Sequence, residues 1–239
     1  IWADRTTSGL LKVRWKGSNT SYNLGERSDA GHQGANPTTG VSPIEVPIAD
    51  STVLLPFAQN GYGHSWAPSH YVLNETAASF ADLIPSIPSG WTSWAGGTGG
   101  ASTGGGTTTP TETAGGWDAA SAVNGATVSG AVATLAYDGP SGIFAAKRIN
   151  PGEKKIFVMR VDEYAEDGSL GLIQQGANLA RFTDGFAGVP GFLLAPFRGT
   201  NYINGVQHQS FSGLDYDASV IEIWADRTTS GLLKIWWKS

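Results

Sequence analysis

The chain has 239 residues, a formal net charge of −5 and no cysteine, so disulfides, cysteine-ligated zinc and thiol catalysis are excluded. The acidic balance, without a basic cluster, argues against nucleic acid as a partner, because neutralising phosphates needs several Lys or Arg on one face. Thirty-three glycines, nine tryptophans and only 15% charged residues are typical of β-strands joined by glycine-rich turns. No apolar run approaches the roughly 18 residues of a membrane span. The start shows neither an initiator Met nor a signal-peptide pattern, so we expect an internal part of a longer protein.

The two ends of the chain carry the same sequence. Residues 1–12 return unchanged as residues 223–234, and residues 13–17 align with residues 235–239 with substitutions. Each copy is expected to form a β-hairpin, with a turn from Arg5 to Gly9 in the first copy. The offset of 222 residues predicts a repeating unit of domain size rather than a short solenoid repeat.

A segment rich in glycine and threonine divides the chain. Residues 96–116 contain almost nothing that can be buried, so we expect a linker there. It leaves residues 1–95, the C-terminal half of one domain, and residues 117–239, the N-terminal half of the next. Alternatively the two halves close on each other as one circularly permuted domain, and then two copies of one hairpin compete for one place in a sheet.

Short strands separated by turns are expected throughout. The clearest is residues 155–161, where Ile156 and Val158 share one face while Phe157, Met159 and Val161 share the other, which favours an inner strand of a sandwich. An Asn-Gly pair at residues 204–205 predicts a turn. Further strands are expected at residues 44–48, 52–57, 70–73, 76–81, 126–129, 131–135, 143–148, 170–174, 192–197 and 220–225. With no helical periodicity of useful length, this pattern predicts an all-β sandwich or barrel.

Several stretches carry a family resemblance when the chain is read from residue 117 across the C-terminus and on from residue 18. They are residues 117–118, the expected edge strands up to Arg148, and residues 154–161, 217–226, 233–238, 36–40, 54–57, 76–80 and 87–91. In this order they resemble a SPRY domain of the type found in phage tail fibres and bacterial surface proteins. The chain departs from the family in having Ala-Ser-Phe-Ala-Asp at residues 78–82, and residues 182–202 are not diagnostic.

The resemblance implies a concanavalin-like, jelly-roll-like antiparallel β-sandwich in a circularly permuted frame with a duplicated terminal hairpin. It also implies recognition of a protein or glycan through loops at one end of the sandwich, on the outside of a cell or virion. One repeat of 222 residues minus the linker leaves about 200, a normal size for one such sandwich.

Ionisable residues give little support for catalysis or metal binding. The carboxylates Asp162, Glu163, Glu166 and Asp167 could bind calcium or supply a glycosidase pair, but their spacing does not match a calcium loop and a solvated turn is favoured. His64 and His70 have no third metal ligand nearby. No serine-nucleophile motif occurs either, so we expect no catalytic residue, no metal and no cofactor.

Two glycine-containing segments, residues 60–66 and 201–208, gather aromatic, amide and imidazole side chains. Such groups stack on sugar faces and bind hydroxyl or peptide groups, which makes them candidates for ligand binding. The candidate ligand-binding residues are Tyr62, His64, Trp66, Tyr202, Asn204 and His208. The alternative is that Tyr62, Trp66 and Tyr202 cap the ends of the core.

The leading interpretation is a non-catalytic structural or binding module of a phage fibre or bacterial surface protein. The alternative is a filament or virion assembly protein that exchanges the repeated hairpin between subunits through an exposed sheet edge. The candidate subunit-pairing residues are Ile1, Trp2, Leu11, Trp15, Ile223, Trp224, Leu233 and Trp237. A third interpretation, a glycan hydrolase, requires two carboxylates facing each other across a groove.

Overall fold

The computed structural model describes residues 2–4, 12–14, 35–60, 69–73, 87–93, 116–136, 139–161, 168–180, 186–196, 198–211 and 219–238. Within these ranges the regular structure is β-strand, apart from one turn of 3-10 helix at Ala119–Ser121. The described part of the chain contains no helix with the length and apolar character that crossing a membrane requires. The fold is therefore all-β, as the sequence predicts.

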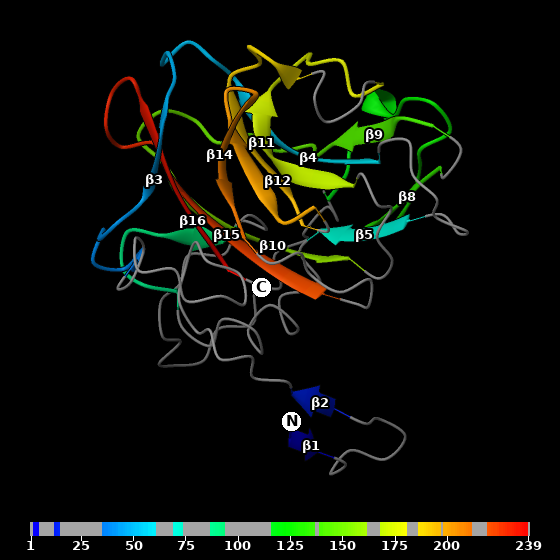
Figure 1. Ribbon diagram of the computed structural model, residues 1–239, viewed down its shortest axis with the longest axis horizontal. Coiled ribbons are helices and arrows are strands. Elements are labelled where there is room, and N and C mark those ends of the chain that lie inside the picture. The colour runs from blue at the N-terminus through cyan, green and yellow to red at the C-terminus, as the bar shows by residue number, and fades with distance from the viewer. Residues whose placement is uncertain are drawn as a thin grey trace, which may run out of the picture.

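Two large sheets form the body of the molecule (Figure 1). The eight-stranded sheet runs β3-β16-β15-β10-β5-β8-β7, with β6 beside β10, and the six-stranded sheet runs β14-β13-β12-β11-β4-β9. All described strand pairs are antiparallel except that of β6 with β10. The strands of the larger sheet are β3 (Ile44–Pro47), β16 (Leu232–Lys238), β15 (Ser219–Asp226), β10 (Lys154–Val161), β5 (Ser69–Leu73), β8 (Val132–Leu135), β7 (Thr127–Ser129) and β6 (Thr92–Ser93). Those of the smaller sheet are β14 (Val206–Ser210), β13 (Thr200–Ile203), β12 (Gly191–Ala195), β11 (Ser169–Gln174), β4 (Leu54–Asn60) and β9 (Ser141–Phe144).

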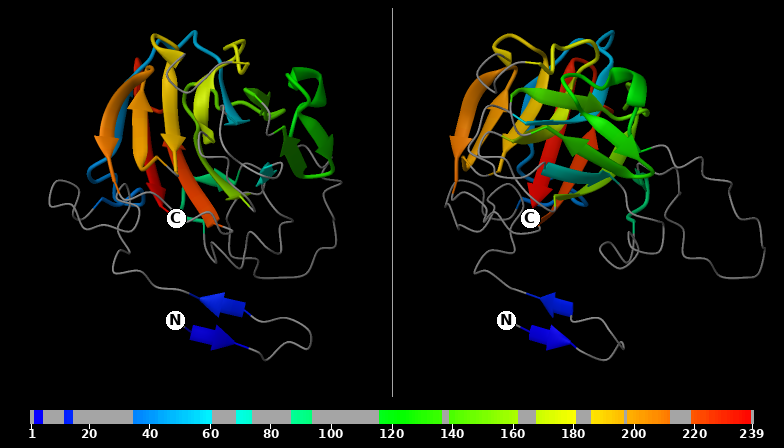
Figure 2. Two further views of the ribbon diagram at one scale, coloured as in Figure 1. Left: turned by 45° about the vertical axis from the view of Figure 1, so that its right-hand side comes forward. Right: turned by 90° about the vertical axis from the view of Figure 1, so that its right-hand side faces the viewer.

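The sheets pack face to face around one apolar core (Figure 2). The larger sheet contributes Phe157 and Met159 of β10, and the smaller sheet contributes Leu172 of β11 and Phe192 of β12. Because side chains alternate along a strand, Ile156 and Val158 of β10 face the opposite side, where they join a second buried cluster. Both faces of β10 are therefore covered, and it pairs with β15 and β5, as expected for an inner strand.

Both sheets contain strands from before and from after residues 96–116. In the larger sheet β3 pairs with β16, and β5 lies between β10 and β8. In the smaller sheet β4 lies between β11 and β9. The two segments thus build one sandwich together. Of the expected linker, only Gly116 lies among the described residues.

Most expected strands in the described ranges are confirmed, with shifted ends. The expected strand at residues 143–148 begins earlier and ends earlier, as β9 at Ser141–Phe144. The Asn-Gly turn is confirmed, because Asn204 and Gly205 have φ values of 50° and 76° and join β13 to β14. The expected strand at residues 76–81 lies outside the described residues.

Two glycines allow β11 and β12 to approach each other closely. Gly171 has φ +149°, and a Cβ added there would lie 2.2 Å from the carbonyl oxygen of Phe192. Gly191 has φ +141°, and its Cβ would lie 2.2 Å from the carbonyl oxygen of Leu172. The two glycines face each other diagonally across the strand pair, so a side chain at either would push the strands apart.

We expect Gly171→Ala to lower the free energy of unfolding by about 3 kcal/mol, because the new methyl collides with backbone that cannot move freely. Gly188→Ala is the control, since Gly188 has φ +77° but open space around its Cβ position, and only the backbone cost of about 1 kcal/mol is expected. Urea denaturation of both variants measures the difference. Equal losses would contradict this account of the strand pair.

Candidate functional site

The candidate ligand-binding residues fall into two groups. Tyr62, His64 and Trp66 lie outside the described residues. Tyr202, Asn204 and His208 all belong to the β13–β14 hairpin. Tyr202 is half-buried and packs against an apolar cluster of the smaller sheet, whereas His208 is exposed on β14, at an irregularity in the pairing with β13.

The side chain of Asn204 forms hydrogen bonds with two backbone segments. Its side-chain oxygen accepts a hydrogen bond from the Gly191 N–H at 2.9 Å, and its amide nitrogen donates to the Pro47 carbonyl at 3.1 Å. The second bond ties the smaller sheet to β3 of the larger one. Asn204, which the sequence predicts as a ligand-binding residue, thus connects backbone segments of the two sheets.

The acidic cluster at residues 162–167 lies outside the described residues, as does His64. In the ranges that the structure describes, no three His, Cys, Asp or Glu side chains come together in a way that could hold a metal ion.

The C-terminal copy of the repeat occupies the position between β10 and β3 in the larger sheet, and we call this position the hairpin slot. Strand β15 pairs with β10 along its whole length, and β16 pairs with β3. Of the residues expected to pair subunits, Ile223, Leu233 and Trp237 are fully buried in the main core and Trp224 is 3% exposed on the other face. The hairpin is an integral part of the sandwich.

A buried arginine fixes the turn of this hairpin. Arg227 is 3% exposed, and its Nη1 donates hydrogen bonds to the carbonyl oxygens of Thr52 and Ile149, both at 3.0 Å. Its Nη2 reaches the carbonyl oxygens of Ala49 and Asp50 at 3.3 and 3.4 Å. Burial lowers the pKa of the guanidinium, which nevertheless stays charged at neutral pH. One side chain thus joins the hairpin to segments on both sides of residues 96–116.

Two carboxylates complete the polar contacts of the turn. Asp226 accepts hydrogen bonds from both the N–H and the hydroxyl of Thr228 and forms an ion pair with Lys154 at 3.2 Å. Asp50 accepts from the Ser230 hydroxyl at 2.5 Å and from the N–H of residue 231 at 2.9 Å. The first set shapes the turn and ties it to β10, while the second ties its tip to the β3–β4 loop.

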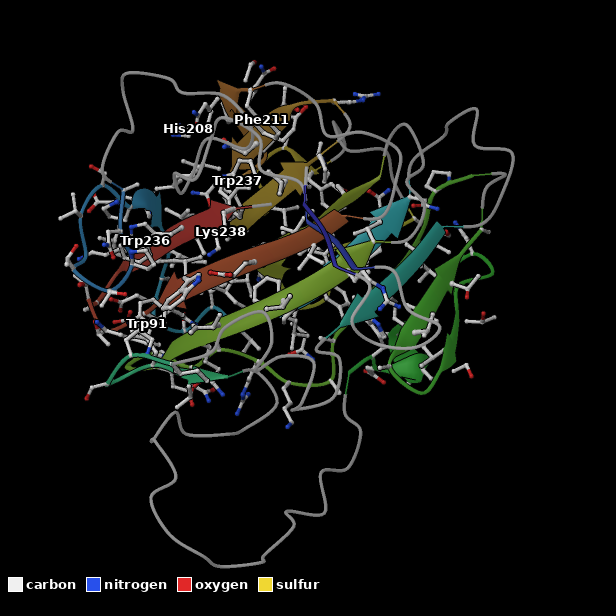
Figure 3. The ribbon with its side chains drawn as sticks, turned by 90° about the horizontal axis from the view of Figure 1, so that it is seen from below. Trp91, His208, Phe211, Trp236, Trp237 and Lys238 are labelled. Atoms are coloured by element: carbon white, nitrogen blue, oxygen red, sulfur yellow. The ribbon has the colours of Figure 1, made fainter. Side chains whose placement is uncertain are left out.

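The outer face of the hairpin is covered by tryptophans. Trp91 contacts Trp224 at a ring-centroid distance of 4.8 Å and Trp236 at 6.0 Å, both nearly edge to face. The indole nitrogen of Trp236 donates to the Val41 carbonyl at 2.9 Å. Figure 3 shows Trp91 and Trp236 near each other, and Trp237 on the side of Phe211, whose ring centroid is 4.8 Å away.

The N-terminal copy forms its own two-stranded sheet from β1 (Trp2–Asp4) and β2 (Lys12–Arg14). Its register is Trp2 with Arg14, residue 3 with residue 13, and Asp4 with Lys12. Adding the offset of 222 residues to each pair gives the register of the C-terminal copy. Among the described residues, β1 and β2 pair with no other strand, and Figures 1 and 2 draw them apart from the sandwich.

The residues that dock the C-terminal turn are repeated in the N-terminal sequence. Asp226, Arg227, Thr228, Ser230 and Leu233 correspond to Asp4, Arg5, Thr6, Ser8 and Leu11. Ile1, Leu11 and Trp15, which the sequence also nominates for subunit pairing, lie outside the described residues, and of Trp2 the backbone is described. Sequence reasoning missed Arg227, although an arginine kept in both copies of a turn was the available signal.

No family model, curated protein or solved structure matches this chain. The fold and the site alone define its class, an antiparallel β-sandwich that is completed by one copy of a duplicated hairpin.

We expect Arg227→Ala to lower the free energy of unfolding by about 3 kcal/mol, because it removes a buried side chain that bonds four backbone carbonyls and leaves the buried Ile149 carbonyl without this donor. Arg5→Ala changes the identical residue of the copy outside the slot, so its effect should stay below about 0.5 kcal/mol. Urea denaturation of dilute protein compares the two. A comparable loss in Arg5→Ala would show that the N-terminal copy occupies the slot.

The two carboxylates make the docking sensitive to acid. Hydrogen bonds from Ser230 and Gly231 lower the pKa of Asp50 below its ordinary 3.8. Burial of Asp226 acts to raise its pKa, but the hydrogen bonds from Thr228 and the contact with Lys154 outweigh burial, so this pKa also lies below 3.8. Depressed carboxyl pKa values stabilise the fold above the unfolded-state pKa, and this stabilisation is lost as pH falls through the lower folded-state values.

The midpoint of urea unfolding should therefore hold steady from neutral pH down to about 4 and fall below it. Asp226→Asn keeps an oxygen that can accept from Thr228 but cannot titrate, so its midpoint should start lower at neutral pH and fall less steeply in acid. The same slope in both proteins would remove Asp226 as a source of the acid sensitivity.

Proposed function

We propose that this protein is a non-catalytic assembly module in which the repeated hairpin of one copy docks into the hairpin slot of a neighbouring copy. The observation that carries the proposal is that the second hairpin has the register of the docked one and repeats the residues that hold it. The docked hairpin and the N-terminal hairpin have nearly the same sequence and are competing occupants of one slot.

The N-terminal hairpin, whose strands pair with no further described strand, has a physical reason to find a partner. A two-stranded hairpin is only marginally stable in water, because it presents unpaired backbone groups on both edges and buries little apolar surface. In the slot, by contrast, the C-terminal hairpin buries Ile223, Leu233 and Trp237 completely and pairs with a strand on each side. The N-terminal hairpin gains the same kinds of contact by entering a slot.

Exchange of identical elements between copies is an inexpensive route to assembly, since the contacts made in the assembly equal those broken in the monomer. Here the chain carries two hairpins for one slot. An N-terminal hairpin therefore docks in a neighbour by displacing that copy's C-terminal hairpin, which can then enter the slot of another copy. Repetition along a fibre or surface layer raises the local concentration of slots and makes weak single contacts effective.

A phage fibre or bacterial surface protein, outside the cell or on the virion, is the setting we propose for such a module. The SPRY resemblance supports this setting, and the absence of cysteine and the low share of charged residues are compatible with it. Recognition of a protein or glycan by loops at the sandwich end belongs to the same setting and is independent of the hairpin.

Light scattering after size exclusion tests the proposal over a series of protein concentrations. We expect oligomers whose fraction rises with concentration in the full chain. Replacing residues 1–17 by a Gly/Ser segment of equal length should give a monomer with an unchanged melting temperature. A full chain that stays monomeric from micromolar to millimolar concentration would refute assembly through the hairpin.

A further inference from the structure

The two hairpins differ in chemical character at one position. Across the aligned copies, residues 13 and 235 are Val and Ile, and residues 17 and 239 are Gly and Ser, but residue 14 is Arg where residue 236 is Trp. Residue 236 is also the position with the most specific surroundings in the slot. Resting on the proposed function, we propose that this position decides which hairpin the slot holds. The slot favours the Trp-bearing hairpin, and the Arg-bearing hairpin enters the slot of a second copy only by displacing it.

The surroundings of Trp236 favour an aromatic side chain. Trp236 is 1% exposed, its ring lies edge to face with Trp91 at 6.0 Å, and its indole N–H donates to the Val41 carbonyl. It belongs to the buried cluster of Ile156, Val158 and Trp224 on the outer face of the larger sheet. An indole fills this space, satisfies its one donor and adds the favourable edge-to-face geometry of aromatic pairs.

Arginine suits this place less well. Burying a guanidinium among apolar side chains costs free energy unless its donors and its charge are matched. The face of Trp91 already carries the Lys154 ammonium, whose nitrogen lies 5.5 Å from the ring centroid. Asp226 pairs with Lys154, and the N-terminal copy carries Asp4 at the corresponding position, so this carboxylate already has a cation to pair with. Glu222 belongs to the C-terminal hairpin and leaves the slot with it. A second cation beside Trp91 therefore meets a like charge without a free carboxylate described near it.

The other substitutions are too small to decide the outcome. Position 235 faces the main core, and exchanging Ile for Val there removes a single methylene group. The turn residues, Arg227 included, are the same in both copies and hold either hairpin equally. The preference for the C-terminal copy therefore depends on Trp236, while the shared turn keeps the N-terminal copy able to dock.

Disulfide trapping can report which hairpin is docked, because the chain has no cysteine of its own. Glu45 of β3 is the register partner of Lys234 of β16, and Lys12 is the residue of the N-terminal copy that corresponds to Lys234. In a full chain carrying Lys12→Cys, Glu45→Cys and Lys234→Cys, the cysteine at position 45 must choose between the two hairpins. Equilibration in a glutathione buffer, tryptic digestion and mass spectrometry give the ratio of 45–12 to 45–234 bonds.

In this background the 45–234 bond should predominate. Exchanging the two residues, with Arg14→Trp and Trp236→Arg together, should raise the ratio of 45–12 to 45–234 bonds by at least about tenfold, because the aromatic contacts move to the other hairpin. Each single change should raise it less than both together. Exchanging Val13 and Ile235 instead is the matched control, and it should leave the ratio nearly unchanged.

The same samples separate the two proposals. An unchanged ratio in the exchanged variant would overturn the role of position 236, whether the bonds lie within or between chains. Non-reducing electrophoresis shows where the 45–12 bonds lie. If they form within single chains only, in every variant and at every concentration, assembly between copies is wrong, while the ratio still tests the choice between the hairpins.

Discussion

The hydrogen bonds of the Arg227 guanidinium to four backbone carbonyls are the contact on which the arrangement of the sandwich depends. The carbonyls belong to the β3–β4 loop and to residue 149 before β10, so one side chain connects segments that the sequence separates widely. A charged side chain is rarely buried to this extent, and here its donors are matched by backbone carbonyls outside the named strands. These hydrogen bonds fix the turn of the hairpin relative to the β3–β4 loop and residue 149, and the hairpin in turn links β10 to β3 in the larger sheet.

The hairpin also explains why the sandwich has two covered faces on its larger sheet. Alternation places Ile223, Ile235 and Trp237 toward the smaller sheet, and Trp224 and Trp236 toward the outside. Trp91, from the segment before the Gly/Thr-rich stretch, closes over the outer tryptophans. The hairpin therefore contributes side chains to two buried clusters, one on each face of the larger sheet. Removing it from the sheet would expose apolar side chains on both faces, which costs free energy.

Much of the fold was predictable, because the signals are local. The alternation in residues 155–161 predicts an inner strand, and the Asn-Gly pair predicts the turn between β13 and β14, since its φ values are ones that few other residues adopt. The docking of the hairpin was not predictable in the same way. The carbonyl partners of Arg227 and the edge-to-face contact of Trp91 join residues far apart in sequence, and no local pattern identifies them. For the same reason the hydrogen bond of Asn204 to Pro47 was not predictable, because Pro47 lies on a distant strand.

Because the chain contains two hairpins of nearly identical sequence, comparing them shows which properties come from the hairpin sequence and which come from the surrounding sheet. The register is encoded, since both copies pair in the same way although one lies inside a sheet and the other pairs with no further described strand. Burial and the polar contacts of the turn come from the slot, which only one copy can fill at a time. We propose that the difference between Arg14 and Trp236 ranks the copies, because the turn residues are repeated and the exchange of Val13 for Ile235 alters one methylene group. Under the proposed function, two hairpins that share the docking residues of the turn but differ at position 14 or 236 act as a resident copy and a transferable one.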